Sequence, residues 1–189
     1  SHLYLPTILS PAGASVAAAS ASSLPSVVPN NYRLPFVGLR TITSGPGCYW
    51  THQGNDFEAI DFGLPSGTSV YAAEQGSLTR FPDLQGYGNT VKISHSDGRI
   101  SWYSHVREFV APNGAASRGS LIAYSGGAAS DPGHGTSTGA HLHFMVLAPG
   151  ARQTEWIRTL PGIRWYSQNS NSPCNVPGSA DGEAEGPPL

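Results

Sequence analysis

The chain has 189 residues, of which 39% are hydrophobic and only 12% are charged, and its formal net charge is −2. This length fits one domain with tails better than two domains, and the small negative charge offers no basic surface that would attract nucleic acid. No apolar run approaches the roughly 18 residues that a membrane span needs, so we expect neither a membrane span nor a nucleic-acid partner.

The two ends of the chain differ in composition from its middle. Residues 1–32 include a low-complexity stretch rich in Ala and Ser, which predicts an N-terminal arm or linker. Residues 177–189 are rich in Gly, Pro and acidic residues, which predicts a solvated acidic tail. The functional domain is therefore expected to span residues 33–176.

Short β-type runs separated by turn residues fill the middle of the chain. The expected strands are 59–62, 68–73, 77–81, 90–95, 99–105, 121–124 and 141–147. Ser96–Gly98 predicts a hairpin between the fourth and the fifth of them, and residues 155–160 are the one candidate for a turn of helix. With 23 Gly and 16 Pro, the sequence predicts an all-β fold, an antiparallel sandwich or barrel.

Two histidines in the last of these strands are the sharpest chemical feature of the sequence. Side chains alternate between the two faces of a strand, so His141 and His143 project to one side while Leu142 projects to the core. Zn²⁺ accepts neutral imidazoles, and a catalytic zinc site needs three protein ligands and a water. The His-x-His pattern alone is weak evidence, so the rest of the site has to come from elsewhere in the chain.

Three further residues are candidates to complete such a site. Asp61 lies between Ile60 and Phe62 in a predicted strand, so its carboxylate faces the polar side of that strand. His52 lies in a loop before this strand, and His105 ends the predicted strand 99–105. Each of the three also fits an ordinary exposed position, and only their combination points to a metal.

The order of the motifs resembles that of the lysostaphin-type (LytM-domain) zinc endopeptidases. The matching segments are Ala59–Ala73, Gly86–Val91, Asp97–Gly98, Trp102–Val106 and Gly135–Phe144, which together cover roughly residues 48–148. The last segment, G-T-S-T-G-A-H-L-H-F, is the most specific. The resemblance implies a compact antiparallel sheet or sandwich with an open groove, to which this chain adds flexible N- and C-terminal segments.

The resemblance also implies roles for five residues. It places zinc on His52, Asp61 and His143, and it leaves His105 and His141 as a catalytic pair that faces the metal. One of the pair would take a proton from the attacking water and deliver it to the leaving amine, and the other would donate a hydrogen bond to the oxyanion. The division of these two roles between the two histidines stays open.

Departures from the family pattern bear on this assignment. The family's first His usually lies four residues before the Asp, where this chain has Phe57, whereas His52 lies nine residues before Asp61 and needs a longer loop. The local form H-x-G-x-D, which ends at Asp56, makes that residue a rival ligand. Met145 stands where the family usually has an acid, a change that would alter a subsite without removing zinc.

Several other residues fit more than one role. His95, beside the predicted hairpin turn, is expected to be structural or exposed, and His134 is expected at the surface, with the groove as the alternative. Asn89 fits either a substrate contact or a turn. Aromatic residues that could line the groove, or pack in the core, are Tyr49, Trp50, Tyr87 and Trp102.

The chain has two cysteines, Cys48 and Cys174, which lie near the two ends of the expected domain. They lack the C-x-x-C spacing of metal and redox motifs. We expect one disulfide between them, with two buried free thiols as the alternative. A disulfide indicates an oxidising compartment, so the protein is expected to be secreted, extracellular or held in the cell envelope.

The family resemblance implies a monomeric, zinc-dependent endopeptidase that hydrolyses peptide cross-links of bacterial peptidoglycan, either Gly-rich bridges or D-alanyl links. One alternative is a non-catalytic module that binds or regulates at the cell wall, against which the complete set of five residues argues. A zinc peptidase that acts on Gly-rich proteins is the other alternative, and the sequence does not separate it from the first.

Overall fold

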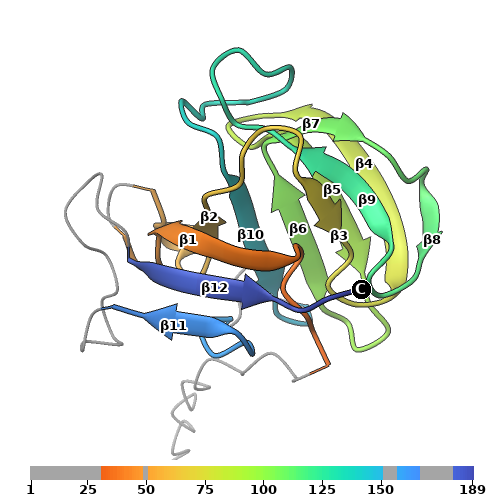
Figure 1. Ribbon diagram of the computed structural model, residues 1–189. Helices are drawn as coiled ribbons and strands as arrows, with labels where there is room; N and C mark the ends of the chain where they lie inside the picture. Colours follow the sequence, from red (N-terminus) through yellow and green to blue (C-terminus); the bar gives the residue numbers. More distant parts are fainter. Residues whose placement is uncertain (1–30, 49–50, 151–156, 167–180) are drawn as a thin grey trace, which may run out of the picture.

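The computed structural model describes residues 31–48, 51–150, 157–166 and 181–189 (Figure 1). In this part of the chain the secondary structure consists of twelve strands and one short 3-10 helix, η1 (Gly54–Asp56). The strands are β1 (Gly38–Ser44), β2 (Ile60–Phe62), β3 (Ser69–Tyr71), β4 (Gly76–Leu84), β5 (Gly88–Ser94), β6 (Ile100–Ser104), β7 (Val106–Phe109), β8 (Gly114–Ala116), β9 (Leu121–Ser125), β10 (Leu142–Leu147), β11 (Ile163–Trp165) and β12 (Gly182–Gly186). The predicted all-β fold is confirmed. Among the described residues, no helix has the length and apolar character to cross a membrane.

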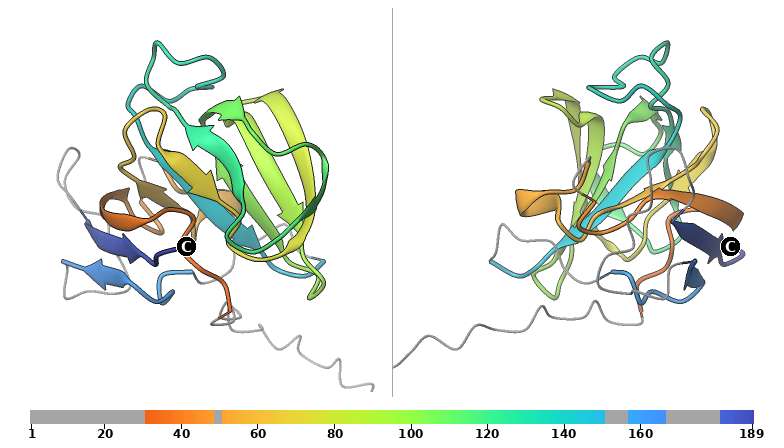
Figure 2. Two further views of the ribbon diagram at one scale, coloured as in Figure 1. Left: turned by 45° about the vertical axis from the view of Figure 1, so that its right-hand side comes forward. Right: turned by 90° about the vertical axis from the view of Figure 1, so that its left-hand side faces the viewer.

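Two antiparallel sheets share one core. The larger sheet has the order β11-β12-β1-β2-β10-β6-β5-β4-β8, and the smaller has the order β3-β9-β7. The smaller sheet lies over one face of the larger, as the turned views in Figure 2 show. Val70 of β3 and Ile122 of β9 are fully buried in the same cluster as Ile93 of β5 and Phe144 of β10. The architecture is therefore a sandwich, as expected.

Strand alternation explains how the core and the functional face are separated. Leu142, Phe144 and Val146 of β10 are all buried, because they point between the sheets. His143 points to the opposite face, where it is the register partner of Asp61 in β2. Two neighbouring strands thus place two polar side chains side by side in the middle of the larger sheet.

The seven predicted strands are all present, with ends that differ by up to a few residues. The predicted hairpin is confirmed, because β5 and β6 pair from Ser94–Ile100 onward through the 96–98 turn. β1, β7, β8, β11 and β12 were not predicted from the sequence; all of them except β1 are short or rich in Gly and charged residues. Residues 157–160 contain a turn and no helix, while residues 155 and 156 of the predicted helical turn lie outside the described residues.

The expectation of a solvated C-terminal tail is wrong where the structure describes that segment. Gly182–Gly186 form β12, which pairs with β1 on one side and β11 on the other. Asp181 and Ala184 are buried, at 2% and 0% exposure. At the other end, Tyr32 of the predicted arm is buried in the core. Residues 1–30 and 167–180 lie outside the described residues.

Candidate metal and catalytic centre

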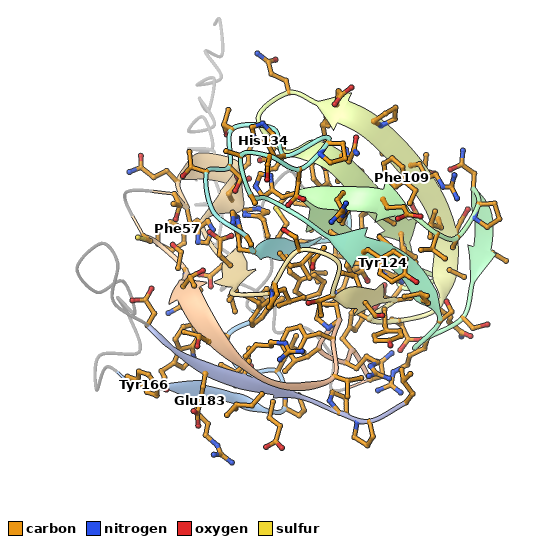
Figure 3. The ribbon with its side chains drawn as sticks, turned by 45° about the horizontal axis from the view of Figure 1, so that its top comes forward. Phe57, Phe109, Tyr124, His134, Tyr166 and Glu183 are labelled. Atoms are coloured by element: carbon orange, nitrogen blue, oxygen red, sulfur yellow. The ribbon has the colours of Figure 1, made fainter. Side chains whose placement is uncertain are left out.

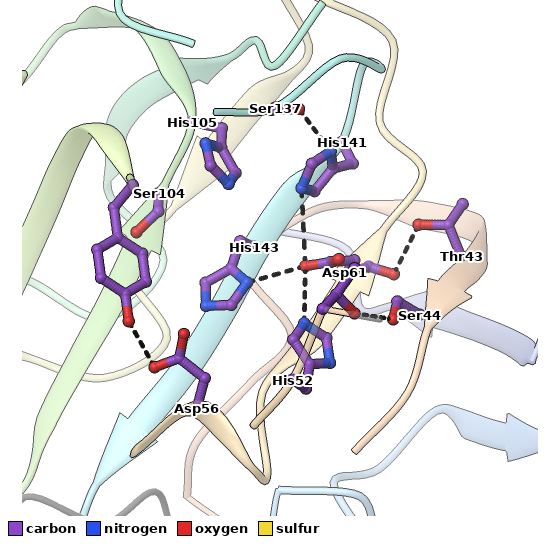
Figure 4. A network of polar contacts seen from close by, with 12 residues as sticks. Thr43, Ser44, His52, Asp56, Asp61, Ser104, His105, Ser137, His141 and His143 are labelled. Atoms are coloured by element: carbon purple, nitrogen blue, oxygen red, sulfur yellow. Dashed lines mark hydrogen bonds and ion pairs between the residues drawn. The ribbon is translucent and has the colours of Figure 1, made fainter. Parts of the chain in front are cut away.

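Three residues that are far apart in the sequence meet at one buried point. His143 Nδ1 lies 2.9 Å from Asp61 Oδ1, and His52 Nε2 lies 3.2 Å from the same oxygen. His52, Asp61 and His143 are only 0%, 6% and 5% exposed. Figure 4 shows both imidazoles turned toward the Asp61 carboxylate. The structure therefore brings together the three predicted zinc ligands.

The loop before β2 carries His52 back to Asp61. The Gly47 backbone N–H donates to the carbonyl of Phe57 at 2.6 Å, and a side chain at Gly47 would collide with the Phe57 ring. The His52 N–H donates to the carbonyl of Cys48 at 2.7 Å, and its Nδ1 donates to the carbonyl of Gly45 at 2.8 Å. Phe57 thus closes the loop from the position where the family usually has its first His. This packing accommodates the longer spacing between His52 and Asp61.

His105 occupies the junction of two strands in an unusual backbone conformation. It follows the last residue of β6, and its φ of 60° lies in the left-handed region, which is uncommon for residues other than Gly. Its Nδ1 donates to the carbonyl of His134 at 2.9 Å, and its backbone N–H donates to the carbonyl of Tyr87 at 3.0 Å. The predicted strand therefore ends one residue earlier than expected, and the kink turns the imidazole toward the centre.

His141 faces the same point from the loop before β10. Its Nε2 lies 3.7 Å from Asp61 Oδ1, and its Nδ1 donates to the carbonyl of Gly139 at 2.8 Å. The rings of His105 and His141 are 4.7 Å apart. In both histidines the proton on Nδ1 is held by a backbone carbonyl, which fixes the tautomer that leaves the Nε2 lone pair free.

Burial and mutual contacts determine the charges in this cluster. Burial alone would raise the pKa of Asp61, but charge interaction with His52 and His141 and hydrogen bonds from the imidazoles hold that pKa well below its usual range. Burial alone would lower the pKa of His52, yet Asp61 raises it overall. Burial, together with repulsion from His141 and His143, lowers the pKa of His105 to about 3. His105 is therefore neutral at pH 7.

The cluster has the features of a cation site. His52, Asp61 and His143 each offer one ligand atom, and these atoms lie within 4.8 Å of one another. The Nε2 atoms of His52 and His143 are buried without a hydrogen bond. Buried polar atoms without a partner are costly, and a metal ion would satisfy them. Two imidazoles and one carboxylate form a ligand set that suits catalytic zinc.

A cavity of about 460 Å³ opens beside the cluster. Its lining residues are Thr51, Asp56, Asp61, Gly86, Tyr87, His105, Thr136, Ser137, Thr138, Gly139, His141 and His143. Asp56, the rival ligand, is not one of the three residues whose ligand atoms converge. Its Oδ1 instead accepts a 2.5 Å hydrogen bond from the Tyr87 hydroxyl. Tyr87 lines the cavity as one of the predicted aromatic residues.

Next to the cavity, the start of β5 packs against the loop between β9 and β10. The Asn89 N–H donates to the carbonyl of Gly133 at 2.7 Å, and a side chain at Gly88 would lie 2.0 Å from that carbonyl oxygen. Only glycine fits such an approach. Asn89 Oδ1 accepts from the N–H of Asp83, so Asn89 shapes the turn. His134, labelled in Figure 3, lies in the loop between β9 and β10 and is not among the cavity-lining residues.

Other predicted residues have structural surroundings. His95 is buried and hydrogen-bonded to the Gln75 carbonyl and to Ser101. Trp102 packs against Tyr87, with ring centroids 5.5 Å apart. Tyr49 and Trp50 lie outside the described residues.

Sequence reasoning missed the second layer of the site. Gly45, which accepts from His52, itself donates its N–H to Asp181 Oδ2 at 2.7 Å. Glu58, three residues before Asp61, forms a buried ion pair with Arg158 at 2.9 Å. Neither partner lies near the site in sequence, and no local pattern marks Asp181 or Arg158. Only the folded structure brings them to these positions.

Comparison with known proteins supports this picture. The model of peptidase family M23 matches residues 55–154. The DD-carboxypeptidase/endopeptidase Mpg of Neisseria meningitidis is 36% identical over 91 residues, which are 48% of this chain and 20% of that protein. The peptidoglycan DD-endopeptidase ShyC of Vibrio cholerae is 32% identical over 111 residues, which are 58% of this chain and 23% of that protein. This chain thus spans about a fifth of the length of these relatives.

Solved structures agree in fold. A zinc-containing peptidase from Vibrio cholerae aligns with a TM-score of 0.52 and 26% identity, over 70% of this chain and 40% of that one. Pseudoalterin, an M23 metalloprotease from the deep sea, aligns with a TM-score of 0.57 and 24% identity, over 82% of this chain and 96% of that one.

Proposed function

This chain belongs to peptidase family M23, and we propose that it is a zinc-dependent endopeptidase that hydrolyses peptide cross-links of bacterial peptidoglycan. One observation carries the proposal: the ligand atoms of the buried residues His52, Asp61 and His143 lie close together beside a cavity. His105 and His141 also line this cavity. The relative named as a peptidoglycan DD-endopeptidase, ShyC, supports the choice of substrate.

We assign the zinc ion to His52, Asp61 and His143. When bound, zinc supplies Lewis acidity that activates water and polarises a carbonyl group at neutral pH. The hydrogen bond from His52 Nδ1 to the Gly45 carbonyl orients the ring so that Nε2 faces the centre. Asp61 supplies the negative charge that offsets part of the charge of a dication.

We assign proton transfer and oxyanion binding to His105 and His141. Each donates its Nδ1–H to a backbone carbonyl, so each keeps a lone pair on Nε2 for a proton from the attacking water. Once protonated, the same nitrogen donates, either to the leaving amine or to the oxyanion of the tetrahedral intermediate. The neutral state of His105 at pH 7 suits it for the accepting role.

The two alternatives are weaker. A non-catalytic module that binds the cell wall has no need for His105 and His141. Both are oriented by hydrogen bonds from Nδ1, and their Nε2 lone pairs remain free beside the candidate metal ligands. The centre is also compatible with hydrolysis of Gly-rich proteins, but the two relatives described above are named a DD-carboxypeptidase/endopeptidase and a peptidoglycan DD-endopeptidase.

We further propose that the protein works as a monomer outside the cytoplasm, secreted or in the cell envelope, with Cys48 and Cys174 joined. Cys48 is buried, and the described part of the chain contains no free cysteine. Cys174 lies outside the described residues. A covalent link from Cys48 would anchor the loop that carries His52.

Purified peptidoglycan offers the direct test of function. The zinc-loaded protein should release muropeptides from intact sacculi, with products identified by mass spectrometry, and a chelator should stop the release. Intact sacculi after prolonged incubation with protein that carries stoichiometric zinc would reject the proposal.

A further inference from the structure

One carboxylate in the cavity has no arginine or lysine partner. Of the two lining acids, Asp61 is surrounded by histidines, whereas Asp56 accepts a hydrogen bond from the Tyr87 hydroxyl through Oδ1 and has only a minor charge interaction with His52. No Lys or Arg lines the cavity, and among the described residues Asp56 forms no ion pair. The second oxygen of Asp56 is thus available to a ligand.

Arginine neutralises carboxylates elsewhere in the molecule. The pairs are Glu58–Arg158, Glu74–Arg118, Asp97–Arg99, Asp131–Arg107 and Glu183–Arg164. Glu108, which has no arginine partner, is exposed, whereas the buried Asp61 and Asp181 accept hydrogen bonds from N–H groups of the protein. Asp56 differs from these groups, because it is half-buried in a cavity wall without an arginine or lysine partner. Such a carboxylate favours a cationic ligand, since the ion pair offsets its lost hydration.

Local structure holds Asp56 in place before a ligand arrives. It ends η1, where its N–H donates to the Gln53 carbonyl at 3.1 Å and its own carbonyl accepts from Ala59 at 2.8 Å. The Tyr87 ring, which holds the carboxylate, packs 5.6 Å from the His143 ring. Asp56 is therefore fixed immediately beside the metal cluster, in the arrangement drawn in Figure 4. A fixed group binds its partner with a smaller entropic cost.

We propose that Asp56, oriented by Tyr87, binds a primary ammonium group on the substrate residue that precedes the cut D-alanine. This inference rests on the proposed endopeptidase function and narrows its substrate class. A D-alanyl cross-link fits, because the D-Ala that is cut follows a diamino acid whose side chain can carry a free ammonium group. An oligoglycine bridge carries no cation beside the cut bond. The cavity charge thus favours D-alanyl links.

A matched pair of synthetic substrates tests this inference. Both are cross-linked peptides in which D-Ala is joined to a side-chain amine; one has lysine before the D-Ala, and the other has Nε-acetyl-lysine there. The zinc-loaded wild type should cleave the lysine peptide with a kcat/KM about 10-fold higher than that for the acetylated peptide. This factor lies between the effect of losing an exposed ion pair and that of losing a buried one. Pentaglycine should be cleaved no better than the acetylated peptide.

Three variants locate the preference. Asp56→Asn should reduce the ratio of the two kcat/KM values to within about twofold. Only the kcat/KM for the lysine peptide should fall, since the substitution removes only the negative charge. Asp56→Glu keeps the charge and should retain the preference. Glu108→Gln removes one exposed negative charge of β7, outside the cavity, and should leave both rates unchanged. Equal zinc content and equal thermal unfolding of the variants establish that the metal cluster is intact.

Calorimetry of the lysine-D-Ala product peptide gives a second readout, independent of turnover. Its dissociation constant should rise about 10-fold on acetylation in the wild type and stay level in Asp56→Asn. Equal values for the two peptides in the wild type, or an undiminished preference in Asp56→Asn, would overturn the inference. If the zinc-loaded wild type cleaves no probe, the proposed function fails, while the binding measurement still decides the role of Asp56.

Discussion

Asp181 and His52 bind the two backbone polar groups of one residue, Gly45. Asp181 Oδ2 accepts from the Gly45 N–H at 2.7 Å, and the Gly45 carbonyl accepts from His52 Nδ1 at 2.8 Å. Both side chains are buried, at 2% and 0% exposure. The residue that leads into the last strand therefore positions a candidate metal ligand more than a hundred residues earlier in the chain.

Removal of Asp181 should weaken zinc binding without touching a ligand. In Asp181→Ala, Gly45 loses its anchor and His52 its fixed orientation, so the zinc dissociation constant should rise about 10- to 100-fold, the usual effect of residues behind metal ligands. Competition with a chromophoric chelator measures this constant. Glu185→Gln, an exposed change in β12, is the control. Unchanged affinity in Asp181→Ala would show that the loop holds His52 without it.

The two aspartates should behave differently toward zinc. Asp61→Ala should abolish stoichiometric zinc, because Asp61 sits in a strand between His52 and His143 and no neighbouring carboxylate replaces it. Asp56→Asn should keep the metal, because Asp56 is bound to Tyr87 instead. Metal analysis of the dialysed proteins decides the matter, and the reverse pattern would move the site onto the loop before β2.

Substitution of either histidine of the proposed catalytic pair should separate metal binding from turnover. His105→Asn and His141→Asn should each keep one zinc per chain and lower kcat by roughly 10²- to 10⁴-fold, the scale for a general acid or base. Asn suits position 105 because it tolerates the positive φ there. Loss of zinc from either variant would contradict the division between ligands and catalytic residues.

Acid should destabilise the metal-free protein partly through His105. Its pKa is lowered to about 3 in the folded state, so between the ordinary pKa near 6.5 and pH 3 the unfolded chain binds a proton that the folded chain does not. Stability from the neutral ring is therefore present above about pH 6.5 and is lost as the pH falls toward 3.

His105→Asn removes this titration. Urea unfolding of the chelated wild type and variant at several pH values gives the difference in their free energies of unfolding. As the pH is lowered from 7 to 3, the free energy of unfolding should fall more for the wild type than for the variant. A pH-independent difference would show that His105 titrates normally.

The proposed disulfide should be visible by thiol titration. Unfolded, unreduced protein should show no free sulfhydryl group, and reduction should expose two. A link between Cys48 and Cys174 closes a loop of more than 100 residues, for which chain entropy gives about 4–5 kcal/mol of stabilisation. Two free thiols before reduction would remove the cysteine argument for an oxidising compartment.

Sequence patterns predicted the parts of the site that local geometry determines. Asp61 between two apolar residues, and His143 after Leu142, could be assigned to strand faces because alternation needs no tertiary information. The convergence of His52 with them depended on the family resemblance, because nothing in a loop sequence specifies where the loop folds.

Features that depend on distant pairing could not be predicted. Gly182–Gly186 has the composition of a solvated tail, and it is a strand only because β1 and β11 flank it. The positive φ of His105 has no signature in the residue type. The Asp56–Tyr87 contact joins two loops, and the rival ligand motif concealed it.

The position of β2 in the sheet limits how the domain can be shortened. The strand that carries Asp61 pairs with β10 on one side and with β1 on the other, and β1 in turn pairs with β12. A fragment cut to the family match at residues 55–154 would lose β1, β11 and β12 together. It would expose a new edge strand, with unpaired N–H and C=O groups ready to pair with another chain. The segments outside the match thus protect the strand that carries Asp61 from aggregation.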